Sequence, residues 1–326
     1  MKQKILIFFT AAVFSLQASV VSFMQIESSA DTLGGANRAM LKSSSAAQYN
    51  ASALPFLESP EVYLFYSRPF AQGYDDNSGV SGMNYFFTSG AFRVRQYNNF
   101  GASFIYLNNS DIEGYDEGGA YLGNFSAHEG ALTLSYSRPV YKNLTGGIKN
   151  TLIFQSIDNY TGVGYQMGLS TSWYVLKNLA FNLNFDNIIS TRIRMADAAP
   201  GYKEKITAEL GISAMPIKFL MLAGSVQYRY QYGFEYNLGT QLMIRDTVFV
   251  NFSYDNNVFS KNISLENKGT ADGNFSSAYY GFRELSGGLG IKLQLIKFDY
   301  NIRFHRELGI THSGGVTLYL KKGLIE

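Results

Sequence analysis

The sequence predicts an all-β fold, an antiparallel β-barrel of about fourteen strands that spans a membrane. Three observations predict it: apolar and polar residues alternate along most of the chain, the alternating segments are long enough to cross hydrocarbon, and their connections are alternately short and long. The 326 residues include 24 Tyr and 25 Phe but only 6 Pro, a composition that favours strands. Only 16% of the residues are charged, whereas a soluble domain usually carries about 25%.

The alternation is clearest in residues 296–305, where apolar residues occupy the even positions and polar or charged residues the odd ones. The same scheme recurs in residues 179–186, 226–232 and 236–245. A period of two indicates strands with one apolar and one polar face, and no helical period repeats over comparable lengths. Alternation alone also fits a soluble β-sandwich. The number and length of the segments favour the membrane barrel.

The connections between strands differ in length at the two ends of the predicted barrel. We predict strands at residues 62–70, 82–95, 100–108, 128–140, 144–156, 163–175, 179–187, 204–215, 219–231, 235–244, 247–256, 281–294, 298–305 and 312–321. The short connections are residues 96–99, 141–143, 176–178, 216–218, 245–246 and 295–297. The longer connections include residues 71–81, 109–127, 188–203 and 257–280. Short turns at one rim and long loops at the other are typical of outer-membrane barrels, which close because lipid cannot satisfy backbone polar groups.

The N-terminus carries the features of an export signal. Lys2 and Lys4 precede an apolar run over residues 5–16, and small residues follow. We therefore predict a signal peptide over residues 1–22, with an uncleaved membrane anchor as the alternative. The exported protein is predicted to reside in the bacterial outer membrane.

Residues 31–60 do not alternate and are rich in Ala, Ser and Gly. We therefore predict a separate N-terminal segment over residues 23–61, before the barrel predicted for residues 62–321. This segment contains a Gly-Gly-Ala start, an Ala-Ala pair, a Tyr-Asn pair and a leucine before the first strand: Gly34, Gly35, Ala36, Ala46, Ala47, Tyr49, Asn50 and Leu54. This pattern resembles the N-terminal signature of the FadL-type outer-membrane transporters and their PorV/PorQ-like relatives. Lys42, Ser43 and Ala51 depart from that pattern, since acidic residues and a proline are common there.

The resemblance implies a barrel of fourteen strands whose N-terminal segment forms a hatch in the lumen, and a periplasmic leader is the alternative interpretation of that segment. It implies passive uptake of small hydrophobic compounds through the hatch-gated barrel. The PorV/PorQ-like branch implies instead an accessory or shuttle for protein secretion or surface attachment. The expected partners are therefore outer-membrane lipid and either a hydrophobic small molecule or a secreted protein. An apolar pocket beneath the long loops would favour transport, and a solid polar network a scaffold.

A membrane barrel turns its polar residues inward. The predicted lumen-lining residues are Asn182, Asn184, Asp186, Gln227, Arg229, Gln231, Asn237, Gln241, Asn251, Asp255, Lys297, Asp299, Asn301 and Arg303. Aromatic residues near strand ends, among them Tyr85, Phe86 and Phe87, predict girdles at the membrane interfaces. Residues 275–282 predict an apolar loop that collects ligand.

The chain offers no motif for catalysis or for a cofactor. It has no Cys, which excludes disulfides, thiol nucleophiles and Cys-based metal sites. His128, His305 and His312 lack metal-ligand spacing, and no nucleotide-binding glycine pattern occurs. Residues 109–120 begin as a calcium loop does, but Ala120 stands at the position of the last ligand, which favours a solvated acidic loop over a weak cation site. We predict no enzyme, no cofactor and, at a net charge of +2, no nucleic acid partner.

Overall fold

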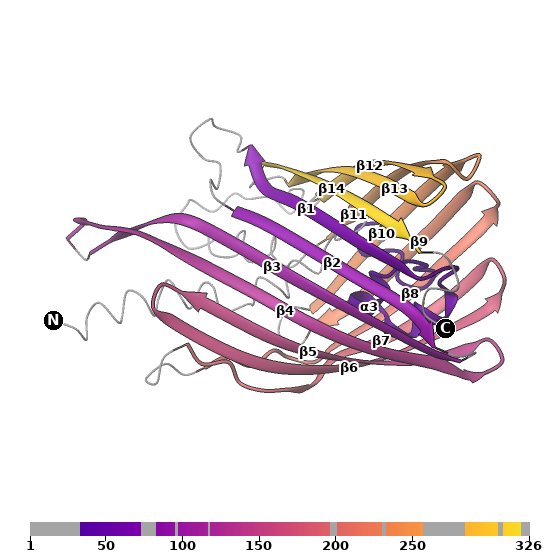
Figure 1. The fold of residues 1–326 in the computed structure, drawn as a ribbon, viewed down its shortest axis with the longest axis horizontal. Coiled ribbons are helices and arrows are strands. Elements are labelled where there is room, and N and C mark those ends of the chain that lie inside the picture. The colour runs from indigo at the N-terminus through magenta and orange to yellow at the C-terminus, as the bar shows by residue number, and fades with distance from the viewer. Residues whose placement is uncertain are drawn as a thin grey trace, which may run out of the picture.

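The computed structural model describes residues 33–72, 83–94, 97–116, 118–195, 201–229, 233–256, 284–305 and 309–320. Fourteen antiparallel strands close into one barrel (Figure 1). The strands are β1 (Glu61–Gln72), β2 (Met83–Val94), β3 (Asn98–Tyr115), β4 (Tyr121–Tyr141), β5 (Leu144–Ile157), β6 (Tyr160–Leu176), β7 (Leu179–Ser190), β8 (Thr207–Ile217), β9 (Leu220–Arg229), β10 (Gly233–Ile244), β11 (Val248–Asp255), β12 (Glu284–Leu293), β13 (Ile296–His305) and β14 (Gly309–Tyr319). The predicted all-β barrel is confirmed. The signal peptide predicted over residues 1–22 and the apolar loop predicted over residues 275–282 lie outside the described residues.

The first and last strands close the barrel by pairing with each other. β1 and β14 are antiparallel neighbours, and Glu61 lies opposite Tyr319. Both ends of the barrel chain therefore lie at the same rim. Closure removes the free sheet edges that hydrocarbon could not satisfy.

The two rims differ as the connection lengths predict, except that β5 and β6, at the end opposite the other short turns, are joined by only two residues. Turns of two or three residues follow β4, β6, β8, β10 and β12 at one end, which lies to the right in Figure 1. We call this end the short-turn rim and the opposite end the long-loop rim. In outer-membrane barrels the rim with short turns faces the periplasm.

One predicted loop is a hairpin instead. Residues 109–127 were expected to be a loop, but β3 continues to Tyr115 and β4 starts at Tyr121, so the two strands pair beyond the rim (Figure 1). The register shifts between Asn109 and Ile112. Water surrounds both faces of a strand pair that leaves the membrane, so this part needs no alternating pattern. The expectation of a loop was wrong for that reason.

The two faces of the sheet differ in polarity. On β13, Phe298 and Tyr300 point outward and each is 48% exposed, whereas Lys297, Asp299 and Asn301 are buried on the inner face. The same order recurs around the barrel, so that an apolar outer surface surrounds a largely polar lumen. No helix within the described ranges is long and apolar enough to cross a bilayer.

Candidate functional site

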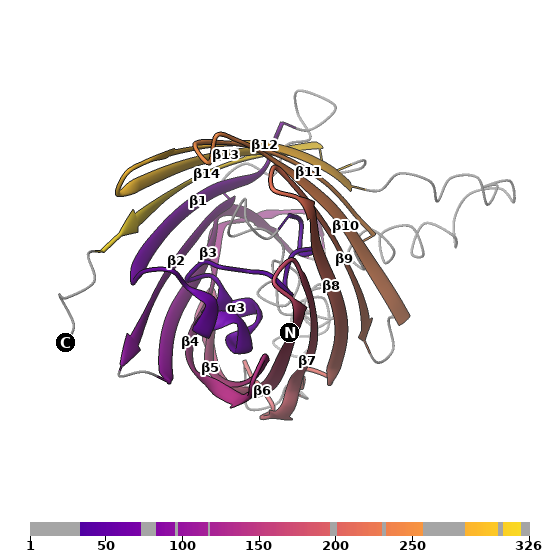
Figure 2. The same cartoon turned by 90° about the vertical axis from the view of Figure 1, so that its right-hand side faces the viewer.

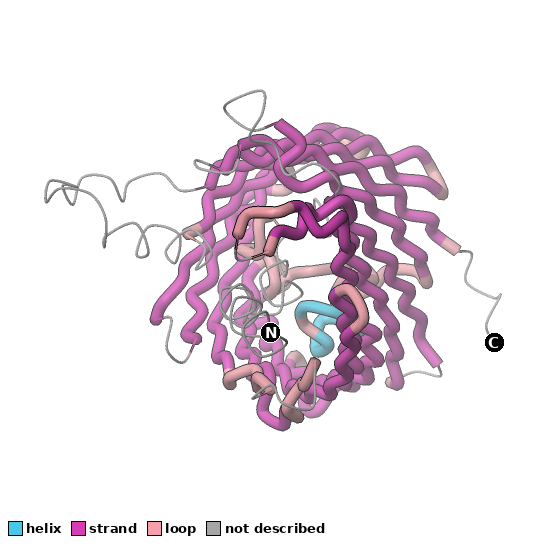
Figure 3. Tube along the Cα trace, turned by 90° about the vertical axis from the view of Figure 1, so that its left-hand side faces the viewer, coloured by secondary structure: helices cyan, strands magenta, loops and turns pink. Residues whose placement is uncertain are grey.

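The described residues before β1 lie largely inside the barrel. Residues 33–57, which we call the lumenal segment, contain a short helix, α3 (Ala46–Tyr49), and a 3-10 helix, η2 (Ala51–Phe56). Both helices lie within the ring of strands when the barrel is viewed from either end (Figures 2 and 3). Between residues 33 and 54, every side chain except that of Lys42 is buried. Small side chains permit this compact path, because they let the segment pack closely on itself and on the wall.

Glycines of the barrel wall mark the places where the lumenal segment docks. A Cβ atom added to Gly147 of β5 would lie 2.4 Å from the backbone nitrogen of Ser52. Gly101 of β3 leaves room for Ala47 in the same way, since a Cβ atom added to Gly101 would lie 2.7 Å from the Ala47 Cβ. Gly239 of β10 receives the start of the segment in the same way. The wall and the segment are therefore complementary in shape on opposite sides of the lumen.

The residues of the predicted hatch motif all belong to this buried segment. Gly34 and Gly35 have φ values of +62° and +86°, which glycine adopts without strain. The Asn50 side chain lies between the two helices and donates hydrogen bonds to the Arg38 carbonyl oxygen at 2.7 Å and to Ser172 Oγ at 3.0 Å. The other motif residues are buried against the wall or within the segment: Ala36, Ala46, Ala47, Tyr49 and Leu54.

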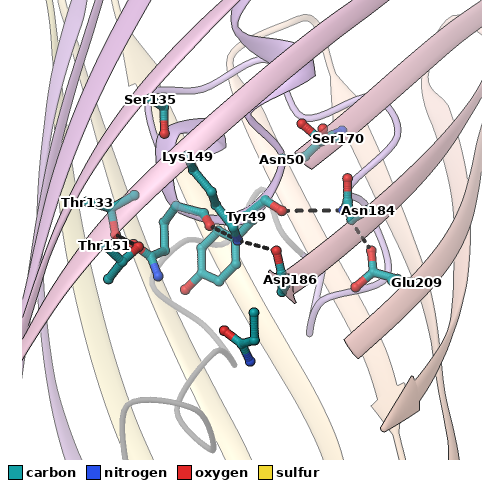
Figure 4. Close-up of polar contacts among 12 residues, drawn as sticks. Tyr49, Asn50, Thr133, Ser135, Lys149, Thr151, Ser170, Asn184, Asp186 and Glu209 are labelled. Atoms are coloured by element: carbon teal, nitrogen blue, oxygen red, sulfur yellow. Dashed lines mark hydrogen bonds and ion pairs between the residues drawn. The ribbon is translucent and has the colours of Figure 1, made fainter. Parts of the chain in front are cut away.

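A buried ion pair joins the lumenal segment to β8. Arg38 pairs with Glu209, and their side chains are only 4% and 2% exposed. Glu209 Oε1 also accepts hydrogen bonds from the side-chain nitrogens of Asn182 at 3.4 Å and Asn184 at 3.3 Å. Asn184 donates in addition to the Tyr49 carbonyl oxygen (Figure 4). Such pairing offsets the large desolvation cost of burying charge.

A second, partly buried cation holds the helical part of the segment. Lys149 Nζ on β5 lies 2.8 Å from Asp186 Oδ1 on β7 and donates to the Gln48 carbonyl oxygen at 2.9 Å (Figure 4). Gln48 Oε1 accepts hydrogen bonds from Ser103 and Thr133, each at 2.8 Å. The neighbouring strands β3, β4 and β5 thus hold the segment through hydrogen bonds to its backbone and side chains.

The structure separates the predicted lumen-lining residues into two groups. Asn182, Asn184 and Asp186 contact the lumenal segment or its ion-pair partners. The second group lies on β9 to β13, and most of its members pair with another side chain of the wall. The pairs are Arg229 with Glu235, Asn237 with Ser225, Gln241 with Asn251, Arg303 with Asp255, and Lys297 with Asp299. Gln227 and Asn301 are buried on the same wall. Gln231 lies outside the described residues. Sequence reasoning missed Arg38, Lys149 and Glu209, although Glu209 stands in an alternating segment.

The lumen also contains an apolar region that the sequence analysis did not predict. We call it the lumenal apolar cluster. It is formed by Tyr63, Phe65, Tyr85, Phe87, Ile105, Leu107, Ala131, Ile153 and Ile193, with Met83 and Tyr202 packed against it. The prediction that Tyr85 and Phe87 belong to an interfacial girdle is wrong, because both are buried in the lumen and only Phe86 faces outward. The available signal was a run of apolar residues on both faces of β1 and β2.

The lumenal apolar cluster lies between the lumenal segment and the long-loop rim. The Tyr49 ring of α3 contacts it at one side, with a centroid distance of 6.3 Å to Phe87. The connection between β7 and β8 covers it at the other side, where Ile193 and Tyr202 exchange two backbone hydrogen bonds of 2.8 and 2.9 Å. Tyr202 Oη donates to Gln155 Oε1 at 2.7 Å. The cluster offers aromatic and aliphatic contacts, which suit an uncharged ligand.

Among the described residues, no three His, Asp or Glu side chains come close enough together to hold a metal ion. The acidic residues of the segment that begins like a calcium loop lie on the protruding hairpin. There the Asp116 carboxylate accepts hydrogen bonds from the backbone nitrogens of Gly118 and Ala120, at 2.9 and 2.8 Å. This is the arrangement of an Asx-type turn.

No protein-family model matches the chain, and no curated protein matches its sequence. The toluene transporter TodX of Pseudomonas putida has a similar structure, with a TM-score of 0.57, 12% sequence identity, and coverage of 86% of this chain and 95% of that chain. The toluene transporter TbuX of Ralstonia pickettii has a TM-score of 0.56 and 11% sequence identity, and the match covers 85% of this chain and 92% of that chain. A FadL homologue of Pseudomonas aeruginosa has a TM-score of 0.52 and 11% sequence identity, and the match covers 88% of this chain and 96% of that chain. The chain therefore has the fold of the FadL-type barrels, which are proteins of the bacterial outer membrane.

Proposed function

We propose that this protein is a passive route by which small hydrophobic compounds cross the outer membrane. The observation that carries the proposal is the lumenal apolar cluster, which places uncharged side chains inside a barrel whose lumen is largely polar. TodX and TbuX, described as toluene transporters, share the fold and support the same conclusion. None of the cluster residues is charged, so a neutral compound suits it better than an ion.

Binding in the cluster would be weak, as passive transport requires. Burial of about 150 Å² of aromatic surface contributes roughly 4 kcal/mol, and this free energy corresponds to an affinity of about 1 mM. The compound would reach the cluster from the long-loop rim, past Ile193 and Tyr202. It would leave towards the periplasm when the lumenal segment moves away from Phe87. In this function the lumenal segment is the hatch.

The polar half of the lumen supports a second function. The wall pairs on β9 to β13, for example Lys297 with Asp299 and Arg303 with Asp255, place charged groups in the lumen without an apolar surface. Such a network suits a rigid barrel of the PorV/PorQ type that holds exported proteins at the outer membrane and moves no small molecule. Retention of a secreted protein by a barrel that does not accelerate uptake would support this second function.

Uptake into liposomes separates the two functions. The purified protein is reconstituted into vesicles loaded with a reporter of toluene, and influx is compared with empty vesicles at equal lipid. We expect faster influx with the protein because the bilayer is crossed through the barrel. Influx equal to that of empty vesicles contradicts transport.

A substitution within the cluster tests whether the route runs there. Ile105→Thr places a hydroxyl among the apolar side chains, and burial of an unsatisfied hydroxyl costs about 1–3 kcal/mol. We expect protein-dependent influx to fall by about fivefold or more. The control is Gln241→Leu in the polar half, which removes the hydrogen bond to Asn251 and is expected to leave influx unchanged. Equal influx in the Ile105→Thr and parent proteins would place the route elsewhere.

A further inference from the structure

Four consecutive short turns each carry one exposed basic residue. These residues are Lys142 after β4, Lys177 after β6, Lys218 after β8 and Arg245 after β10. We call them the basic rim. The only acidic residue in the four turns is Asp246. Within the described part of the chain none of the four cationic groups forms an ion pair, so their charge is available to a partner.

Each cation stands beside an exposed apolar side chain. The neighbours are Tyr141, Leu176, Phe219 and Ile244, which are 65%, 57%, 57% and 54% exposed. The apolar outer surface of the barrel therefore continues to the ends of these strands and, at Phe219, into the turn. Hydrocarbon that covers this surface brings the next residue to the depth of the lipid headgroups.

The side chains can reach that depth without leaving the barrel surface. Lys142 Nζ lies 5.2 Å from the centroid of the Tyr141 ring, so its methylene groups follow apolar surface while the ammonium group stays in water. Lysine and arginine at membrane interfaces commonly adopt this arrangement. Moreover, Lys142 and Arg245 have φ values of +40° and +53°, a backbone region that favours glycine or asparagine. Turn conformation therefore does not explain the choice of a basic residue there.

We propose that the basic rim binds the phosphate groups of anionic phospholipids in the periplasmic leaflet. Charge complementarity selects this occupant, because four unpaired cations border an apolar surface that lipid already covers. Basic residues near an anionic membrane surface each attract its lipids appreciably, and the attraction weakens within a Debye length. The site is separate from the lumen and does not depend on the transport proposed above.

The single Trp of the chain provides the probe. Trp173 lies on the outer face of β6, is 54% exposed, and pairs with Leu144 on β5 and Phe181 on β7. It is therefore close to the turns that carry Lys142 and Lys177. The full-length protein is reconstituted into phosphatidylcholine bilayers with a fixed fraction of brominated phosphatidylglycerol or brominated phosphatidylcholine, and quenching of Trp173 fluorescence is measured.

At low salt, we expect brominated phosphatidylglycerol to quench Trp173 more strongly than the same bulk fraction of brominated phosphatidylcholine. The difference should correspond to an enrichment of the anionic lipid around the barrel of about fivefold. The preference should disappear at 0.5 M NaCl and in the variant K142Q/K177Q/K218Q. The matched control R192Q/R194Q/K203Q removes three exposed cations near the long-loop rim and should keep the preference. Heat-resistant migration in SDS verifies that each variant is folded. Equal quenching by both lipids in the parent protein, or an unchanged preference in the first variant, overturns the proposal.

Discussion

Arg38→Met is expected to release the lumenal segment from the barrel wall. The substitution leaves Glu209 on β8 with 2% of its side chain exposed and without its cation. Removal of one partner of a buried pair costs about 3–5 kcal/mol, although the hydrogen bonds from Asn182 and Asn184 remain. Movement of the segment reduces this desolvation cost most easily, because water then reaches the Glu209 carboxylate. We expect the population of the released segment to rise about a hundredfold or more.

The measurement uses the absence of cysteine from the chain. Ser45→Cys introduces one thiol within the buried part of the segment, where Ser45 is 0% exposed. The rate of maleimide labelling then reports how often the segment is accessible. Labelling of Ser45→Cys should be slow in the parent background and about a hundredfold faster with Arg38→Met.

The double variant R38M/E209Q separates charge from packing. It removes both formal charges and keeps an oxygen that accepts from Asn184, so labelling should return most of the way to the parent rate. If the double variant is labelled as fast as Arg38→Met, then the packing of the arginine side chain holds the segment, and the uncompensated charge does not. Such a result would mean that the ion pair does not control the movement of the lumenal segment.

The ion pair also shows what the sequence can and cannot predict about this site. Alternation assigns Glu209 to the inner face, because Thr207, Glu209 and Ser213 alternate with apolar residues on β8. Pairing with Arg38 depends on how a nonperiodic segment crosses the lumen. No local pattern specifies that path, since the partners are far apart in the sequence. The fold follows from a period of two, whereas the contacts of the segment require the structure.

The lumenal apolar cluster was missed for a different reason. The rule that a membrane barrel is polar inside treats every apolar residue as lipid-facing. On β1 this rule fails, because Leu64 faces lipid while Tyr63 and Phe65 face the lumen. On β2, Phe86 and Phe87 differ in the same way. Where a strand is apolar on both faces the pattern loses its period, and the loss itself indicates an apolar lumen.

Gly147→Val is expected to displace the lumenal segment by shape alone. A Cβ at this position would lie 2.4 Å from the Ser52 backbone nitrogen and 2.6 Å from the Ala51 carbonyl carbon. Backbone atoms cannot rotate away as a side chain can, so η2 must move. Such overpacking costs about 1–3 kcal/mol, whereas valine itself favours a strand. We expect labelling of Ser45→Cys to become about tenfold faster, without loss of the barrel.

The matched control is Gly287→Val on β12, where the atom nearest to an added Cβ is 3.9 Å away. This variant should label at the parent rate, because the new side chain has room and the lumenal segment is not its neighbour. Gly147→Val separates two accounts of how the segment is held. If labelling stays slow although the barrel is folded, then the ion pair with Glu209 and the hydrogen bonds from Lys149 dominate, and close packing on the wall is secondary. If labelling rises as expected, close packing on the wall contributes to holding the segment, in addition to the ion pair that Arg38→Met removes.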